Sequence, residues 1–278
     1  MIVMPPVKAV GGSGNRHVVY LLAGTTSWTT PPGVTSLDSI GLWGPGGDGG
    51  YHGGGGAAFT GVNNIPVTPG QVFSTNIPTH NSTNASVYTW FDSVLTYRAE
   101  GGWPGDTGSA GRGGLASNGL GTVKNNGGNG DGSFGGGGAA AGPDGDGAVG
   151  GSAGGSGSTT GAGGGGSDGG GPGSNNLENG GTSDGGTNHA GQSGGVPPGG
   201  NGPNPGTGGA GSGLYPSNGG NGADDQDLGG GGCGGGPGHN PGGAAGNGGQ
   251  PGGGAGGARF GGASATGGDG LIKIVYRT

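Results

Sequence analysis

The stretch that decides the fold runs over residues 101–268, and its part at 127–151 reads GGNGDGSFGGGGAAAGPDGDGAVGG. Runs of four glycines recur at 135–138, 163–166 and 229–232, with prolines and small polar residues between them. Long aliphatic side chains are nearly absent, so the stretch cannot form a hydrophobic core of the ordinary kind. Any order in it has to come from the backbone.

Three conformations are open to such a stretch. Disorder is typical of a tract rich in proline, glycine and serine that has no strict period. A collagen helix needs glycine at every third residue, and segments such as ADDQDL at 223–228 break that register. The third conformation is a bundle of left-handed, polyproline-II-like glycine helices, which have three residues per turn and no internal hydrogen bonds. Neighbouring helices then satisfy each other's backbone groups.

The energies of ordering and hydrogen bonding are close. Fixing one residue's backbone costs about 1–2 kcal/mol, and more for glycine, whereas a net hydrogen bond returns about 0.5–1.5 kcal/mol. A free-standing glycine bundle is therefore marginal. Anchoring both of its ends in a stable domain lowers the entropy that it loses. We therefore favour a bundle of polyglycine-II-like helices over disorder, on the condition that it is inserted in a folded domain.

Residues 17–100 hold nearly all the long apolar side chains and carry no helical periodicity. Their alternation slips near Asp38 and Ser39, which indicates a β-bulge. The pattern of β-branched and aromatic residues between turn signals predicts short strands. These are expected at 17–22, 25–30, 34–43, from 57 onward, at 71–77, and in a hairpin of 86–91 and 93–98 separated by Asp92. The predicted fold is an all-β sandwich, jelly-roll-like, with essentially no α-helix.

A last strand is expected at 271–276, where Ile272, Ile274 and Tyr276 share one face. It has no partner nearby in the sequence, so its expected place is in the N-terminal sandwich. The glycine-rich stretch then becomes an insertion with two anchored ends. The predicted organisation is an N-terminal arm at 1–16, a sandwich of 17–100 plus 269–278, and a glycine bundle at 101–268.

Composition excludes several classes of function. The 278 residues are 26% hydrophobic, which allows one small core, and the net charge is −7 without a basic patch, so we expect no nucleic-acid partner. No apolar run is long enough for membrane insertion. The single cysteine, Cys233, excludes a disulfide framework. The histidines are scattered without metal-ligand spacing, and no phosphate-binding loop occurs. We therefore expect no enzyme and no cofactor. The histidines lie at positions 17, 52, 80, 189 and 239.

The breaks in the glycine pattern are candidate binding loops, because rigid scaffolds commonly carry binding residues on loops. Tyr215 with Leu214 is the best anchor for a receptor, since an aromatic ring with a polar tip suits sugar or protein contact. Leu177 and Leu228 are further candidates. An equally good interpretation is that all four side chains plug the ends of the bundle or pack on the sandwich.

An acidic cluster lies in the same region. GGNGAD at 219–224 fits the first part of a calcium-binding β-roll repeat, and Asp224, Asp225 and Asp227 offer carboxylates to a hard cation. The β-roll needs this repeat in tandem, and the repeat is absent. A solvated acidic loop is therefore favoured over a calcium site, and no metal is expected.

Four segments together carry a family resemblance. They are WTTPPGVT at 28–35, GPGGDGG at 44–50, VTPGQVF at 67–73 and GGDGLIKIVY at 267–276. In this order they resemble the opening, middle and closing strands of the glycine-rich domain of bacteriophage tail proteins. The segment PTHN at 78–81 departs from the pattern, where more glycine is expected. More distantly, the chain resembles phage tip adhesins with glycine-helix bundles, whose binding residues lie in loops between helices.

This resemblance implies a non-enzymatic virion protein, a minor tail or tail-fibre component in contact with the host cell surface. Its expected partners are other tail proteins, a bacterial surface glycan or protein, and further copies of the chain. It would assemble in the host cytoplasm and be exposed on the particle. The alternative is a purely structural decoration of the capsid or tail that binds no receptor.

Overall fold

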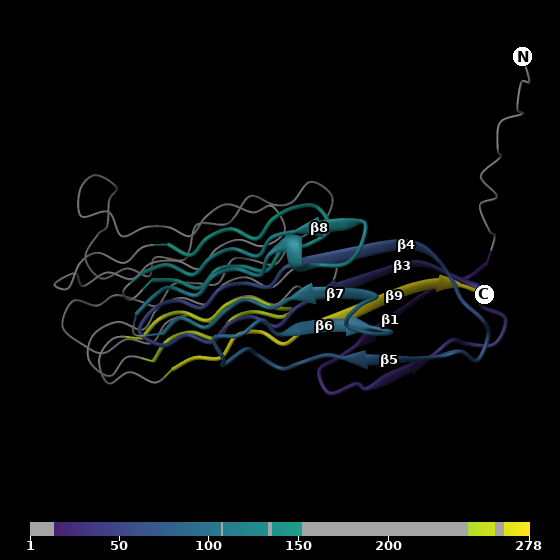
Figure 1. Cartoon of the computed structure of the whole chain (residues 1–278), viewed down its shortest axis with the longest axis horizontal. Helices are drawn as coiled ribbons and strands as arrows, with labels where there is room; N and C mark the ends of the chain where they lie inside the picture. Colours follow the sequence, from purple (N-terminus) through teal and green to yellow (C-terminus); the bar gives the residue numbers. More distant parts are fainter. Residues whose placement is uncertain (1–13, 107, 133–134, 152–243, 259–263) are drawn as a thin grey trace, which may run out of the picture.

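The computed structural model describes residues 14–106, 108–132, 135–151, 244–258 and 264–278. Their regular structure is antiparallel β-sheet, and the one helical element among them is a single 3-10 turn, η1 (Ala116–Asn118). The molecule is elongated, with the sheets at one end and long glycine-rich segments extending from them at the other (Figure 1). No helix in the described ranges is long and apolar enough to cross a membrane.

Within the described ranges, nine strands form two sheets. The larger sheet has the spatial order β1 (Arg16–Leu21), β9 (Leu271–Arg277), β3 (Ser36–Trp43), β4 (Phe59–Pro66) and β8 (Val123–Asn125). The smaller sheet has the order β2 (Ser27–Thr29), β5 (Val72–Asn76), β6 (Tyr88–Phe91) and β7 (Tyr97–Glu100). The prediction of an all-β architecture without α-helix therefore holds for the part of the chain that the structure describes.

One hydrophobic core lies between the two sheets. Leu37, Ile40 and Ile274 of the larger sheet share it with Phe73 and Phe91 of the smaller one, and all five are at least 95% buried. Each fully buried side chain of this size contributes about 1.5–3 kcal/mol relative to an exposed one. The core therefore joins the two sheets into one folding unit.

The last strand lies in the sandwich, as the sequence predicts. β9 pairs with β1 and β3, both antiparallel, and Ile272, Ile274 and Tyr276 are buried on its core face. The predicted bulge is also present, because the pairing of β3 with β9 shifts register between Leu37 and Ser39. This extra residue lets Leu37 and then Ile40 face the same core although they are three positions apart.

One local expectation fails, and one strand was not expected. The hairpin of β6 and β7 exists, but Asp92 is not its whole turn: the connection spans 92–96 and β7 begins at Tyr97. One residue cannot reverse an antiparallel chain, since even the tightest common hairpin loop has two. The sequence also gave no sign of β8, whose three residues are too few for a periodicity and pair with β4.

Asp92 itself adopts a left-handed conformation, with φ of 70°. We expect Asp92→Ala to destabilise the protein by about 1 kcal/mol, because a Cβ-bearing residue without a local hydrogen-bonding side chain is disfavoured there. Asp92→Gly should stay within about 0.5 kcal/mol of the wild type, because glycine tolerates positive φ. Urea unfolding of the two variants measures both values. Equal destabilisation by the two substitutions would contradict this explanation.

We call the extended segments beside the sheets the glycine array. Its segment 53–58 donates hydrogen bonds of 2.8–3.1 Å to three other segments in rotation. The N–H groups of residues 53 and 56 donate to segment 126–132. Those of residues 54 and 57 donate to segment 244–258, and those of residues 55 and 58 donate to segment 100–106. The array comprises residues 44–58, 100–106, 108–114, 126–132, 135–151, 244–258 and 264–270.

The carbonyl groups of the same segment are used in the same way. The carbonyl groups of residues 53 and 56 accept from segment 108–114. Those of residues 54 and 57 accept from segment 135–151, and those of residues 55 and 58 accept from segment 44–47. Segment 53–58 thus has hydrogen-bonded neighbours on six sides, and its pattern repeats every three residues. All six of its residues are buried.

Close approach of backbones explains the glycine content. A Cβ on Gly56 would lie 1.9 Å from the carbonyl oxygen of Ala139, and one on Gly55 would lie 2.1 Å from that of Arg112. Real Cβ atoms essentially never come within 3.0 Å of another heavy atom. Side chains are therefore excluded from these positions by the hydrogen bonds themselves.

Candidate functional site

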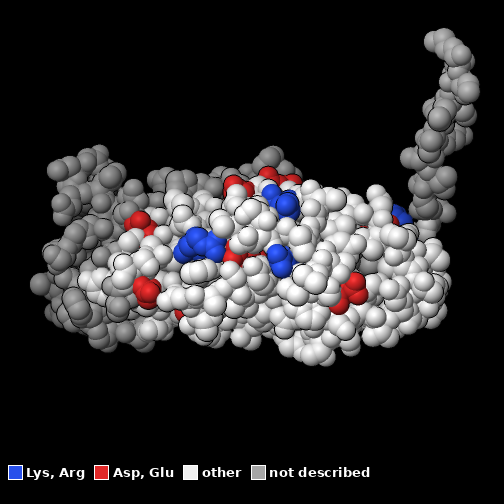
Figure 2. Space-filling model, in the orientation of Figure 1, with Lys and Arg blue, Asp and Glu red and all other residues white. Residues whose placement is uncertain are grey.

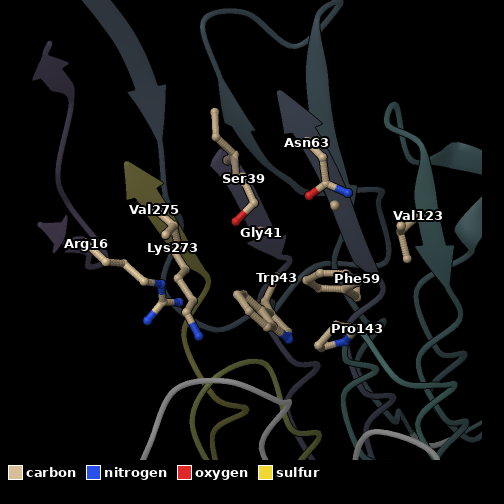
Figure 3. A pocket seen from close by; sticks show the side chains of 12 residues that line it. Arg16, Ser39, Gly41, Trp43, Phe59, Asn63, Val123, Pro143, Lys273 and Val275 are labelled. Atoms are coloured by element: carbon tan, nitrogen blue, oxygen red, sulfur yellow. The ribbon is translucent and has the colours of Figure 1, made fainter. Parts of the chain in front are cut away.

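A hollow on the outer face of the larger sheet is the candidate site, with a cavity volume of about 250 Å³. It lies where β1, β9, β3 and β4 meet β8 and the nearby loop of the array (Figure 3). Its lining includes two glycines, two aromatic rings, two basic side chains and two neutral polar ones. These are Gly41, Gly61, Trp43, Phe59, Arg16, Lys273, Ser39 and Asn63, with Ile40, Val123, Pro143 and Val275 completing the wall.

The floor is built by small residues beside large ones. A Cβ on Gly41 would lie 3.2 Å from atoms of both aromatic rings, and a Cβ on Gly61 would lie 3.1 Å from Phe59. The rings of Trp43 and Phe59 lie 4.8 Å apart at 54°. Because the two glycines have no side chain, the rings of Trp43 and Phe59 lie close against the sheet at these positions, and the hollow remains above the sheet.

The aromatic floor is fixed in place. The indole Nε1 of Trp43 donates to the carbonyl oxygen of Ala141 at 2.9 Å, which ties β3 to the array. Trp43 is 1% exposed and Phe59 4% exposed, and both pack with Ala57, Ala140 and Leu271 in a second small core. A ligand would therefore meet ring edges rather than an open ring face.

The charge of the hollow is one-sided. Figure 3 shows Arg16 and Lys273 extending from β1 and β9 on the same side of it, with Asn63 across from them on β4. The Lys273 ammonium lies 5.8 Å from the ring centroid of Tyr20. None of the twelve lining residues is acidic. The two basic side chains of the lining therefore lie at one side of the hollow and the amide at the other.

This concentration of cations is a local feature. On the face shown in Figure 2, basic and acidic side chains are few and interspersed, with no broad area of one sign. The whole chain carries a net charge of −7. The lining of the hollow therefore has a positive charge, whereas the whole chain has a negative net charge.

A second polar cluster lies between the smaller sheet and the array. The Glu100 carboxylate is fully buried and accepts from Ser86 Oγ at 2.7 Å, the Leu115 N–H at 2.8 Å, Asn118 Nδ2 at 3.0 Å and Arg112 at 3.0 Å. Burial alone would raise the pKa of Glu100, but the hydrogen bonds from Arg112, Ser86, Leu115 and Asn118 outweigh it and hold the pKa below its ordinary value. The Arg112 guanidinium also stacks over Trp103, 4.8 Å from its centroid. Every oxygen is occupied, so the cluster holds the fold together and has no free group for chemistry.

A third cluster joins 78–81, the segment that departs from the family pattern, to the array. His80 Nδ1 contacts both carboxylate oxygens of Asp48, at 2.7 and 2.9 Å, and Asp48 Oδ1 also accepts from the Gly267 N–H at 3.0 Å. Burial raises the pKa of the nearby Asp269, against the opposing effect of His80. No group of three or more His, Cys, Asp or Glu side chains placed to hold a metal ion occurs among the described residues.

The sequence-predicted site residues fall in a part of the chain about which the structure says nothing. Leu177, Leu214, Tyr215 and Leu228, together with the acidic Asp224, Asp225 and Asp227, lie outside the described residues. The hollow, in turn, was not predicted from the sequence. Its one sequence signal is a glycine two positions from an aromatic on the same strand face, in Gly41-Leu42-Trp43 and Phe59-Thr60-Gly61. No protein-family model and no curated protein matches the chain.

Proposed function

We propose that this chain is a non-enzymatic structural protein of a phage virion, a minor tail or tail-fibre component in contact with the host surface. A jelly-roll-like sandwich attaches it to other tail proteins. The glycine-rich insertion at 101–268 projects from the sandwich as a bundle of polyglycine-II-like helices. A bacterial surface glycan or protein is the partner at its far end, and further copies of the chain are partners within the particle.

The observation that carries this proposal is the placement of Asn15 and Thr278 relative to the array. Asn15 and Thr278 exchange backbone hydrogen bonds of 3.1 and 3.2 Å, at the end of the sandwich away from the glycine array (Figure 1). A sandwich held by that end presents the array outward. This polarity suits an attached protein that extends toward another surface.

The bundle is supported by the hydrogen bonds of segment 53–58. Their repeat of three residues is the period of a polyproline-II-type helix, and six hydrogen-bonded neighbours are what a helix in the middle of a bundle needs. The described parts of the insertion at 108–114, 126–132, 135–151 and 244–258 supply four of those neighbours. The proposal extends the same packing to the rest of the insertion.

Immunogold electron microscopy tests the location. An antibody against residues 101–151 is applied to phage particles from the source of the sequence. We expect label at the tail tip or at the fibre ends. Label spread over the capsid or the tail shaft would instead favour a decoration protein without a receptor. Particles free of label, with the protein found elsewhere in the sample, would overturn the virion proposal.

A further inference from the structure

We propose that Asp131, which is followed by Gly132, is a site of spontaneous covalent modification in the folded protein, where the backbone isomerises to isoaspartate. Within the described ranges it reacts before the Asn-Gly pairs, although Asn-Gly is the more reactive sequence in an unfolded chain. This modification goes beyond the proposed function and does not depend on it.

The reaction joins a side chain to the next backbone nitrogen. That nitrogen attacks Cγ of Asn or Asp and forms a bond to it, and the side-chain amino or hydroxyl group leaves with the amide proton as ammonia or water. Water then opens the resulting succinimide. Opening at the backbone carbonyl gives isoaspartate, in which the chain continues through Cγ. A following glycine favours the attack, because it has no Cβ to hinder the approach.

The Asn-Gly pairs of the described ranges are restrained at the attacking nitrogen. In each pair the glycine N–H donates to a backbone carbonyl at 2.8–3.0 Å, and this hydrogen bond has to break before the nitrogen can turn toward the side chain. The four glycines are Gly119, Gly127, Gly130 and Gly248, and their respective acceptors belong to Ala116, Gly114, Gly111 and Thr266.

The asparagine side chains of the same pairs are restrained too. Each amide group makes a hydrogen bond of 2.8–3.0 Å to a residue ten or more positions away, and rotation of Cγ toward the next nitrogen breaks it. Both reacting groups are therefore held. The four bonds join Asn118 to Glu100, Asn126 to Ala116, Asn129 to Gly113 and Asn247 to Thr266.

Asp131 and Gly132 have neither restraint within the described parts of the chain. The Gly132 N–H donates to no described group, and the Asp131 carboxylate has no hydrogen bond or ion pair with a described residue. A Cβ on Gly132 would meet nothing within 4 Å, so there is room for the ring to close. Both residues are half-buried, so water reaches the succinimide.

The other described Asp-Gly pairs are held as the Asn-Gly pairs are. In three of them the glycine N–H donates to a backbone carbonyl at 2.8–3.0 Å, and in the fourth neither residue is without a partner. The three glycines are Gly49, Gly147 and Gly270, and the fourth pair is Asp144 with Gly145. Hydrogen bonding thus singles out Asp131 among the described pairs.

Peptide mapping by mass spectrometry tests this order of reaction. The full chain is kept at neutral pH, folded and in guanidinium chloride, until Asp131 has reacted in the unfolded sample. In the folded protein we expect isoaspartate at Asp131 and intact Asn118, Asn126, Asn129 and Asn247. In the unfolded chain these asparagines should react first, at least about tenfold faster than in the folded protein, because their hydrogen bonds are gone. Any of the four reacting before Asp131 in the folded protein, or an unmodified Asp131 there, would overturn the proposal.

Three variants test the cause. Asp131→Glu keeps the charge but would have to close a larger ring, so isomerisation should stop, and Gly132→Ala should slow it by hindering the attacking nitrogen. Gly56→Ala disturbs the bond from the Gly56 N–H to the Gly128 carbonyl and should speed deamidation of the adjacent Asn129, because local opening frees its reacting groups. Unchanged isomerisation in Gly132→Ala would contradict attack by this nitrogen. Equal deamidation of Asn129 in Gly56→Ala and the wild type would contradict protection by the array.

Discussion

Replacing Gly56 by alanine is expected to lower the stability of the protein by about 3 kcal/mol or more. The new Cβ would lie 1.9 Å from the carbonyl oxygen and 2.2 Å from the carbonyl carbon of Ala139. Overpacking costs about 1–3 kcal/mol when flexible side chains can yield. Here the neighbour is backbone, so segments must separate and lose hydrogen bonds worth about 1 kcal/mol each. At about 2–4 °C per kcal/mol the melting temperature falls by about 6–12 °C.

The matched control for this prediction is Gly132→Ala. Gly132 belongs to the same array, but a Cβ there would meet nothing within 4 Å. We expect its stability to stay within about 0.5 kcal/mol of the wild type. Thermal unfolding followed by circular dichroism compares the two variants. If both variants melt together with the wild type, close backbone packing does not hold the array.

Removing the buried carboxylate of Glu100 is expected to lower the stability of the protein by about as much as Gly56→Ala. Glu100→Ala leaves the Ser86 hydroxyl, the Asn118 amide, the Leu115 N–H and the Arg112 guanidinium without their acceptor. Arg112 is 33% exposed and stays partly solvated, but each buried donor left without its acceptor costs about 1–3 kcal/mol, and several donors lose theirs here. The cluster joins β7 to residues 112–118, so its loss loosens the base of the array.

The control is a second acidic residue in an exposed pair. Asp38 pairs with Arg277 at 3.0 Å, and both side chains are more than a third exposed. Asp38→Ala should therefore cost about 0–1 kcal/mol. Guanidinium unfolding gives both values. Comparable losses in the two variants would show that burial of Glu100 adds nothing.

The same cluster makes stability depend on pH. The pKa of Glu100 in the folded protein lies below its ordinary value of 4.5. Because the pKa of Glu100 is lower in the folded protein, its carboxylate contributes its full stabilisation at pH values above the ordinary pKa. This stabilisation is lost as the pH falls through the pKa of the folded protein. The stability difference between the wild type and Glu100→Gln should thus be constant above about pH 5.5 and shrink on acidification below the ordinary value. A difference that grows as the pH falls would have the wrong sign.

The sandwich was predictable because its side chains alternate. Ile272, Ile274 and Tyr276 mark one face of β9 by their period of two, and the slip at Asp38 marks the bulge. A buried apolar face constrains register strongly, since a shift by one residue would expose it. Sequence pattern and tertiary structure therefore agree in this part of the molecule.

Side-chain alternation could not predict which segments of the array are neighbours, or where the hollow lies. In segment 53–58 every direction is occupied by another backbone, so no side-chain period distinguishes one side from another. Its hydrogen-bonded partners lie from a few to about 200 residues away, and glycine carries no mark of which partner it has. The hollow depends on five strands meeting on one face, and Glu100 depends on partners up to 18 residues away.

Hydrogen exchange at the amides of residues 53–56 tests most directly whether backbone hydrogen bonds between glycine segments replace a hydrophobic core. Each of these N–H groups donates to another segment at 2.8–3.1 Å and is buried. We predict protection close to that of the β3 and β9 amides, because opening any one of them requires separating packed segments. Exchange at the rate of an unstructured glycine peptide, with β3 and β9 still protected, would contradict an ordered glycine array.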